Sequence, residues 1–225
     1  MREFTECDLR EMRKCPLFSG LSGKKLETAL DFFDACIRIY KKGQMLHIAG
    51  DRLAFFGLVL SGTVQVYEDD IDGNQMIMNN VTAGHTFGES LCYLRCESRI
   101  YIKALTDCRI LAMAPVHVNR YDRKMSDTEA AFSERFTAML AERTLAMNRR
   151  IQILSKLTLR EKLITFFTEY SQKADGEGGY FTVPFQRDDM AVYLGTNRSA
   201  LSRELSKMKK EGVIDFERNR FRILR

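Results

Sequence analysis

Short apolar runs, separated by turn residues, recur between Ile37 and Ala114. They read LVL, TVQVY, MIM and RILAMA, and glycines punctuate the stretches between them. Short strands with turn signals at such intervals are typical of antiparallel β structure, and a small barrel or roll closes such strands without exposed edges. Asp72-Gly73, between two of the runs, predicts a tight hairpin turn. Ahead of this region, the pattern over residues 8–36 predicts short helices.

One long helix is predicted from about Ser126 to Leu157, a stretch without glycine or proline. Six of its positions alternate at steps of three and four, the spacing of a heptad seam between two helices. These positions are Thr137, Leu140, Thr144, Met147, Ile151 and Leu154. A second apolar face carries Phe132, Phe136 and Met139. We therefore expect one face to pack on the β-roll and the other on a partner helix; a helix buried inside one core is the alternative.

The last third of the chain predicts a helix-turn-helix followed by a hairpin. In order, the expected elements are a helix after Leu157, a Gly-rich loop at 176–179, a short strand at Phe181–Phe185, a helix at Gln186–Leu194 and a second helix to about Glu211. Gly195 separates the two helices, and Thr196 or Asn197 can cap the second. The hairpin at 213–224 is typical of the wing of a winged helix. The alternative is a solvated helix in an ordinary α/β core.

Polar residues occupy one face of the second helix of this pair. Ser199, Ser202 and Arg203 share that face at i, i+3 and i+4. The Arg guanidinium can donate two hydrogen bonds to O6 and N7 of guanine, and a Ser hydroxyl can hydrogen-bond a base or a phosphate. We therefore expect the helix to enter the major groove of double-stranded DNA. The predicted DNA contacts are Asn197, Arg198, Ser199, Ser202, Arg203, Lys207 and, on the wing, Arg218. Lys209 and Lys210 are further candidates for phosphate contacts.

Charge and composition add two points. The 225 residues carry a formal net charge of +5, and basic residues outnumber acidic ones after Lys156, whereas Glu68–Asp72 forms an acidic cluster. This bias favours a polyanionic partner. No stretch approaches the ~20 apolar residues of a membrane span, and the charged N-terminus lacks the apolar core of a signal peptide. We therefore expect a cytoplasmic protein with no membrane association and six reduced cysteines.

A β-roll, a long helix and a winged helix-turn-helix, in that order, resemble the cyclic AMP receptor protein and fumarate-nitrate reduction regulator (CRP/FNR) family of bacterial transcription factors. The resemblance covers the whole chain. Beyond the helix-turn-helix, it rests on PLF at 16–18, KGQ at 42–44, AGD at 49–51, LSGTV at 60–64 and AGHTFGE at 83–89. It implies an α+β fold: an effector-sensing jelly roll of the cyclic-nucleotide-binding type at 1–125, a dimerisation helix at 126–156 and a DNA-binding domain at 157–225.

The resemblance also implies a function, that of a transcription regulator and not an enzyme. A homodimer would bind a near-palindromic operator with half-sites one helical turn, ~34 Å, apart. An effector in the roll would shift the population between dimer arrangements, and an activator would also contact RNA polymerase. Ser199 stands where the cyclic AMP and fumarate-nitrate regulators carry Glu, so their operator is not assumed for this chain.

A candidate effector site follows from the same resemblance. In cyclic-nucleotide-binding members, a Gly-Glu pair and an Arg ten residues later hold the ribose and the cyclic phosphate, and Gly88, Glu89 and Arg99 match that spacing. Ile100 stands where such members have Ser or Thr, and Asn148 falls where the long helix would contact the base. The candidate effector residues are Gly88, Glu89, Ser90, Arg99, Ile100 and Asn148. Both a cyclic nucleotide and another small molecule remain open as the effector.

An iron-sulfur cluster and haem are not expected as cofactors. The iron-sulfur branch of the family needs four thiolates, several of them clustered near the N-terminus, and Cys7 and Cys15 form no such cluster. His85 is interpreted as a surface-turn histidine rather than a haem ligand. Cys92 and Cys96 would share one face if helical, which leaves open a thiol switch or metal pair beside two plain small hydrophobes.

Two other functions fit the sequence less well than DNA binding. A cupin-like metalloenzyme needs two or three histidines and a carboxylate around one metal, whereas the only histidines are His47, His85 and His117, with no His-x-His pair. A nucleotide-binding regulatory module acting on a protein partner would leave the winged helix unexplained. The sequence therefore favours a dimeric, DNA-binding regulator.

Overall fold

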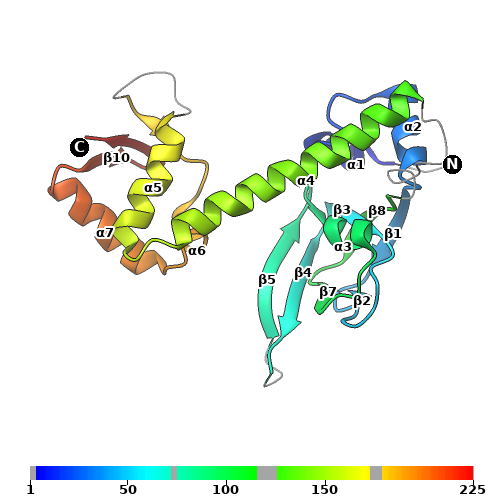
Figure 1. Ribbon diagram of the computed structural model, residues 1–225, viewed down its shortest axis with the longest axis horizontal. Helices are drawn as coiled ribbons and strands as arrows, with labels where there is room; N and C mark the ends of the chain where they lie inside the picture. The colour runs from blue at the N-terminus through cyan, green and yellow to red at the C-terminus, as the bar shows by residue number, and fades with distance from the viewer. Residues whose placement is uncertain (1–3, 72–74, 116–125, 173–178, 225) are drawn as a thin grey trace. The chain divides into compact units, whose positions relative to one another are not determined.

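The computed structural model describes residues 4–71, 75–115, 126–172 and 179–224. They form two compact units, Met1–Ala141 and Glu142–Arg225, and most of their elements are labelled in Figure 1. The predicted hairpin turn at Asp72-Gly73, most of the predicted Gly-rich loop and His117 lie outside the described residues.

The first unit is built of short helices and short strands. Its helices are α1 (Glu6–Lys14), α2 (Gly23–Phe32), α3 (Glu89–Leu94) and the first part of α4 (Asp127–Leu154). Its strands are β1 (Cys36–Tyr40), β2 (Met45–His47), β3 (Phe56–Ser61), β4 (Thr63–Asp69), β5 (Gln75–Thr82), β6 (Thr86–Phe87), β7 (Ile100–Ala104) and β8 (Cys108–Met113).

The strands form two antiparallel sheets, ordered β1-β8-β3-β6 and β2-β7-β4-β5. This arrangement confirms the predicted β-roll. Residues of β3 alternate between two cores, because successive side chains of a strand point to opposite faces. Phe56, Leu58 and Leu60 lie in the core beneath the helices, whereas Val59 lies in the core that β4 and β7 also line. Burial on both faces explains why this strand reads as a continuous apolar run.

The long helix α4 confirms the prediction of an uninterrupted helix with two apolar faces. Phe132, Phe136 and Met139 are buried in the core that also contains Phe33 and Phe56. The rings of Phe136 and Phe56 lie 5.3 Å apart. One face of α4 thus packs on the β-roll, as predicted. Packing of the seam on a partner helix stays a prediction.

The second unit contains the end of α4 and the whole winged helix. Its other elements are α5 (Leu159–Gln172), β9 (Phe181–Thr182), α6 (Arg187–Tyr193), α7 (Arg198–Lys210), β10 (Ile214–Glu217) and β11 (Arg220–Ile223), and the strands form a sheet ordered β10-β11-β9. One apolar core joins α5, α6, α7 and the sheet through Phe166, Phe167, Leu201, Leu205 and Phe221. Ile153 of α4 also belongs to this core, so the last turns of α4 pack within the second unit.

Candidate functional site

The turn between α6 and α7 has the geometry of a helix-turn-helix. Gly195 adopts φ 64°, in the left-handed region that favours glycine, and a Cβ there would lie 3.3 Å from Leu154. Asn197 caps α7, because its side-chain oxygen accepts a 2.8 Å hydrogen bond from the Ala200 amide. Asn197 therefore has a structural role within the protein besides its predicted contact with DNA.

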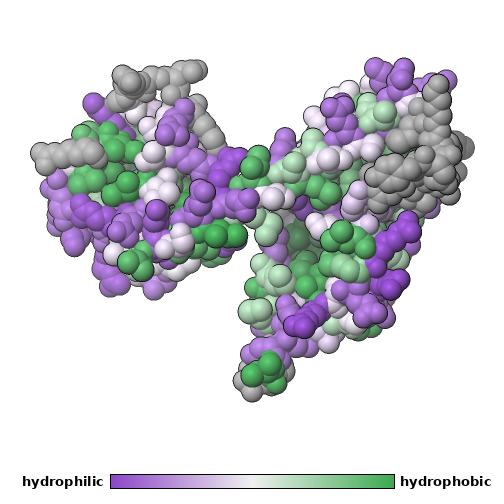
Figure 2. Space-filling view, in the orientation of Figure 1, coloured by the Kyte–Doolittle hydropathy of each residue, from purple (hydrophilic) through white to green (hydrophobic). Residues whose placement is uncertain are grey.

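The exposed face of α7 carries the predicted recognition residues together. Ser199, Ser202, Arg203 and Lys207 are all exposed, whereas the opposite side of the helix is buried in the core. Ser202, Arg203 and Lys207 also line one shallow groove with Ser206, Lys210 and Glu211. Figure 2 shows a largely hydrophilic surface, in purple, over this part of the second unit.

Three of the basic residues predicted to contact DNA differ in the contacts that they make within the protein. Arg198 forms a 2.9 Å ion pair with Asp188, in which both side chains are about two-thirds exposed, so water screens it and a phosphate can compete for the guanidinium. Within the described part of the chain, the Arg203 guanidinium has no hydrogen bond or ion pair, so it is available to a ligand. Lys209, in contrast, pairs with Asp215 at 2.7 Å and donates to the Phe216 carbonyl.

Lys209 therefore joins α7 to the wing instead of reaching outward. Its ammonium group and the Tyr180 hydroxyl, which also hydrogen-bonds Asp215, lower the pKa of the Asp215 carboxyl to about 2. Sequence reasoning placed Lys209 among the phosphate contacts, because helical spacing alone does not show that a strand follows closely enough to take the ammonium group.

The wing is a two-stranded hairpin with a two-residue turn. Glu217 pairs with Arg220, which leaves Arg218 and Asn219 as the turn residues. Arg218 is exposed and adopts φ 52°, a left-handed conformation unusual for a residue with a side chain. Arg218 thus lies in the tight, exposed turn at the tip of the wing, where it was predicted.

The structure places the candidate effector residues of the roll in two different surroundings. Gly88 caps the N-terminus of α3 with φ 80°, and a Cβ there would come within 2.3 Å of Leu53. Glu89 begins α3 and is buried, while the neighbouring Ser90 is exposed. The Gly-Glu pair is therefore a close-packed corner of the roll.

Arg99 lies elsewhere, exposed at the edge of a pocket of about 640 Å³. Four carboxylates and an aromatic ring line this pocket with it: Glu68, Asp69, Asp70, Glu97 and Tyr101. Neither Gly88 nor Glu89 is among the described residues that line it. A carboxylate-lined pocket is an unfavourable environment for a cyclic phosphate, since the anions repel it.

The residues on either side of Arg99 are more buried than Arg99 itself. Ser98 is buried and its hydroxyl lies 2.9 Å from Nε2 of the buried His47, whereas Arg99 is exposed and Ile100 half-buried. Burial lowers the pKa of His47, so its ring is neutral at pH 7. Asn148 is exposed on the part of α4 that belongs to the second unit.

The cysteine pair after Glu89 does not share a helical face. Cys92 lies in α3 and is buried, but α3 ends at Leu94, and Arg95 follows in the left-handed region with φ 52°. Cys96 therefore lies beyond the helix and is exposed. Desolvation raises the pKa of the Cys92 thiol to about 11.

The two thiols are expected to differ strongly in reactivity. Because the thiolate is the reactive form and the Cys92 pKa is about 11, roughly one Cys92 side chain in a thousand is ionised at pH 8. Alkylation with iodoacetamide at pH 8, followed by peptide mass spectrometry, should modify Cys96 well before Cys92. Unfolding in urea is the control and should equalise the two rates. Equal rates in the folded protein would contradict the burial of Cys92.

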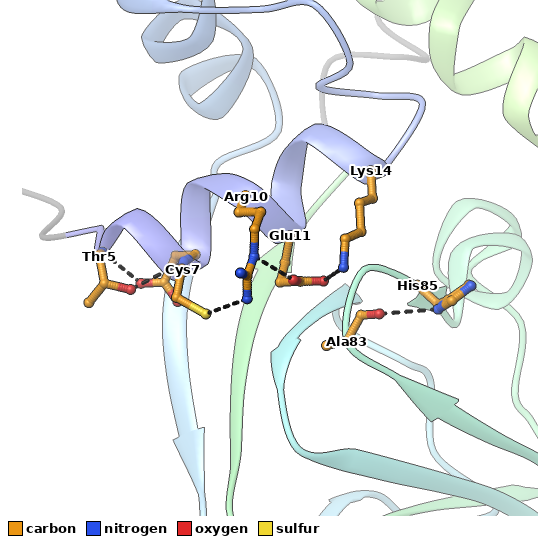
Figure 3. Close-up of polar contacts among 8 residues, drawn as sticks. Thr5, Cys7, Arg10, Glu11, Lys14, Ala83 and His85 are labelled. Carbon is orange, nitrogen blue, oxygen red and sulfur yellow. Dashed lines mark hydrogen bonds and ion pairs between the residues drawn. The ribbon is translucent and has the colours of Figure 1, made fainter.

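Figure 3 shows polar contacts within α1 and, separately, one contact within the turn that carries His85. Glu11 is buried and accepts from Lys14 at 2.6 Å and from Arg10 at 3.3 Å. Nδ1 of the exposed His85 lies 3.3 Å from the Ala83 carbonyl. Among the described residues, no group of three or more His, Cys, Asp or Glu side chains is arranged to hold a metal ion.

Sequence reasoning missed one residue that contacts the wing in the second unit. Arg187, the first residue of α6, reaches the wing turn and hydrogen-bonds the carbonyl of Arg218. No spacing rule within α6 indicates this contact, because the partner is thirty-one residues away along the chain.

Comparison with known families identifies both parts of the chain. Residues 37–121 match the model of the cyclic nucleotide-binding domain, and residues 161–225 match that of the Crp-like helix-turn-helix domain. The two matches fall on the β-roll and on the winged helix. No helix within the described ranges is both long enough and apolar enough to span a bilayer.

Individual relatives match over most of the chain. The cyclic AMP receptor protein of Thermus thermophilus is 25% identical over 203 residues, which cover 90% of this chain and 89% of the relative. The transcriptional activator protein FnrL of Cereibacter sphaeroides is 24% identical, with 81% and 74% covered. Among solved structures, DNR from Pseudomonas aeruginosa is 19% identical with a TM-score of 0.50, covering 99% of this chain and 96% of that one. At this identity, the structural match shows the fold alone.

Proposed function

This chain belongs to the CRP/FNR family of transcription regulators, and we propose that it binds a near-palindromic operator as a homodimer under the control of a small effector in the β-roll. The exposed face of α7 carries this proposal. Arg203 projects there without a partner among the described residues, between hydroxyl and lysine side chains that can serve the phosphates. Arg218 on the wing and Arg198 at the start of α7 extend the cationic surface.

A second copy of the chain is the proposed partner of the α4 seam. Met147 and Ile151 are 65% and 60% exposed, which is unusual for large apolar side chains that recur at heptad spacing. Two copies packed through these faces would present two α7 helices to successive major grooves. We place the dimerisation helix at 126–156, between an effector domain at 1–125 and a DNA-binding domain at 157–225.

We propose that α4 relays the effector signal, because its C-terminal end packs on the helices of the winged helix-turn-helix. Arg149 pairs with Glu169 of α5 at 3.1 Å, and Arg150 lies over the Tyr193 ring of α6 with 5.4 Å to its centre. The turn residue Gly195 packs beside Leu154. A change in α4 imposed by an effector would therefore move the helix-turn-helix with it.

The effector we propose is a small molecule bound by the roll, and the surroundings of Arg99 disfavour a cyclic nucleotide. Isothermal titration with cyclic AMP and cyclic GMP should give no saturable heat, and millimolar ligand should not raise the melting temperature. Arg99→Ala is the control. Saturable binding that disappears in Arg99→Ala would contradict this expectation and assign Arg99 to a phosphate.

Selection from a random double-stranded DNA library with the purified full-length protein tests the proposed function. We expect enriched sites with two related half-sites whose centres lie about one helical turn apart. Affinity for these sites should fall steeply as salt rises, because each phosphate contact releases counterions. Enriched sites that carry only a single half-site would contradict the proposed near-palindromic operator.

Two further expectations follow from binding an operator. A DNA-binding regulator acts where the chromosome lies, so we propose the cytoplasm as its site of action. If the bound dimer activates transcription, RNA polymerase is the partner expected beside it. We propose no iron-sulfur cluster and no haem for this chain, since Cys7 and Cys15 do not supply the required group of thiolates and His85 faces its own turn.

A further inference from the structure

Arg187 makes an unusual set of contacts with the wing. Its Nη2 donates a 2.7 Å hydrogen bond to the carbonyl oxygen of Arg218. Its guanidinium carbon lies 5.3 Å from the ring centre of Phe216 and 5.0 Å from that of Phe221. Nη1 is buried and has no hydrogen-bond partner among the described residues. This desolvation is costly, and it lowers the pKa of the Arg187 guanidinium.

The carbonyl that Arg187 holds belongs to the strained residue of the wing turn. Arg218 has φ 52°, a left-handed conformation that is unfavourable for a residue with a Cβ. Two hydrogen bonds fix this turn from outside the hairpin: the Arg187 contact and a 2.9 Å bond from the Val183 amide to the Asn219 carbonyl. Loss of the Arg187 contact would therefore release the turn toward ordinary conformations.

We infer that Arg187 is a positioning residue for DNA binding, which fixes the wing turn so that the Arg218 side chain meets a phosphate while Arg187 itself does not touch the DNA. This inference rests on the proposed function, because it takes DNA to be the ligand that Arg218 contacts. The planar guanidinium suits this role because it can stack on two rings and donate to a carbonyl at once. An ammonium group on a flexible chain offers no such plane.

The alternative is that Arg187 swings out and contacts a phosphate directly. The two roles differ in three respects. A direct contact depends chiefly on charge, which lysine keeps. It would also add to the contact of Arg218, whereas a positioning role acts through Arg218 and overlaps with it. Only the positioning role loosens the wing when no DNA is present.

DNA affinity measured against salt concentration distinguishes these roles. The full-length variants are Arg187→Lys, Arg187→Gln, Arg218→Ala and the double variant Arg187→Gln/Arg218→Ala, with Lys156→Gln as an exposed charge control. We expect both Arg187 variants to bind on the order of tenfold more weakly, with a salt slope lower by about one per protomer. The double variant should match Arg218→Ala. Wild-type affinity of Arg187→Lys, or additive losses in the double variant, would overturn the inference.

Hydrogen exchange of the free protein supplies the second measurement. Residues 217–220 should exchange faster in Arg187→Lys than in the wild-type protein, while α7 stays protected. Unchanged exchange at 217–220 would overturn the inference whether or not DNA binds. A wild-type protein that binds no DNA would contradict the proposed function alone, and exchange at the wing would still decide the positioning role.

Discussion

Replacing Arg203 with alanine is expected to abolish discrimination between the operator and unrelated DNA, while the fold and the dimer stay intact. Arg203 is exposed, so its truncation leaves no cavity and no buried group without a partner. In the proposed complex, the Arg203 guanidinium donates two hydrogen bonds to one guanine of each half-site. A bidentate contact of this kind is worth about 1–3 kcal/mol of discrimination, and two half-sites double that to about 2–6 kcal/mol.

The measurement compares the affinity for a selected operator with that for a scrambled duplex at the same salt concentration. Lys207→Ala is the matched control on the same helix face, because a lysine proposed to contact phosphate should weaken binding to both duplexes equally. Circular dichroism and the melting temperature check that Arg203→Ala folds normally. An unchanged preference for the operator in Arg203→Ala would contradict the groove contact assigned to Arg203.

The sequence predicted the elements well wherever one periodicity ran unbroken. The apolar run of β3 and the apolar face of α4 at Phe132, Phe136 and Met139 both follow from side chains that must reach a core, and these cores are present. Gly195 and Asn197 correctly predicted the turn between α6 and α7. A left-handed backbone conformation favours glycine, and a helix N-cap favours a short polar residue such as asparagine.

Contacts between segments distant in sequence were harder to predict. Arg99 matches a phosphate ligand by spacing, but the structure places it among carboxylates of β4 and of the segment before β7. Lys209 and Arg187 both contact the wing, although nothing in their own helices indicates it. The spacing of residues along the sequence predicts which face of a helix or strand a residue lies on. Which residues of other segments contact that face depends on the tertiary fold.

The second large effect is expected at the dimer seam, where we predict that Met147→Glu and Ile151→Glu make the protein monomeric. Both side chains are exposed in the single chain, so a carboxylate there does not disturb the unit itself. In a dimer the same carboxylates would be buried in pairs, without partners and close to their symmetry mates. Each variant should therefore fold normally and fail to associate.

Monomers would bind one half-site at a time and lose the benefit of simultaneous engagement. That benefit commonly reaches 10²–10⁴ in affinity, so operator binding should weaken on the order of 10²-fold or more, while contacts to a single half-site persist. Sedimentation velocity gives the association state, and binding to duplexes with one or two half-sites gives the affinities.

Gln152→Glu is the matched control, since it adds the same charge to the same helix next to Ile151 but away from the seam. This variant should remain dimeric and bind both duplexes as the wild-type protein does. If Met147→Glu and Ile151→Glu stayed dimeric, the proposed seam would be wrong and the second copy would have to pack elsewhere. If they became monomeric with operator affinity unchanged, one DNA-binding unit would suffice, and the near-palindromic operator would no longer be required.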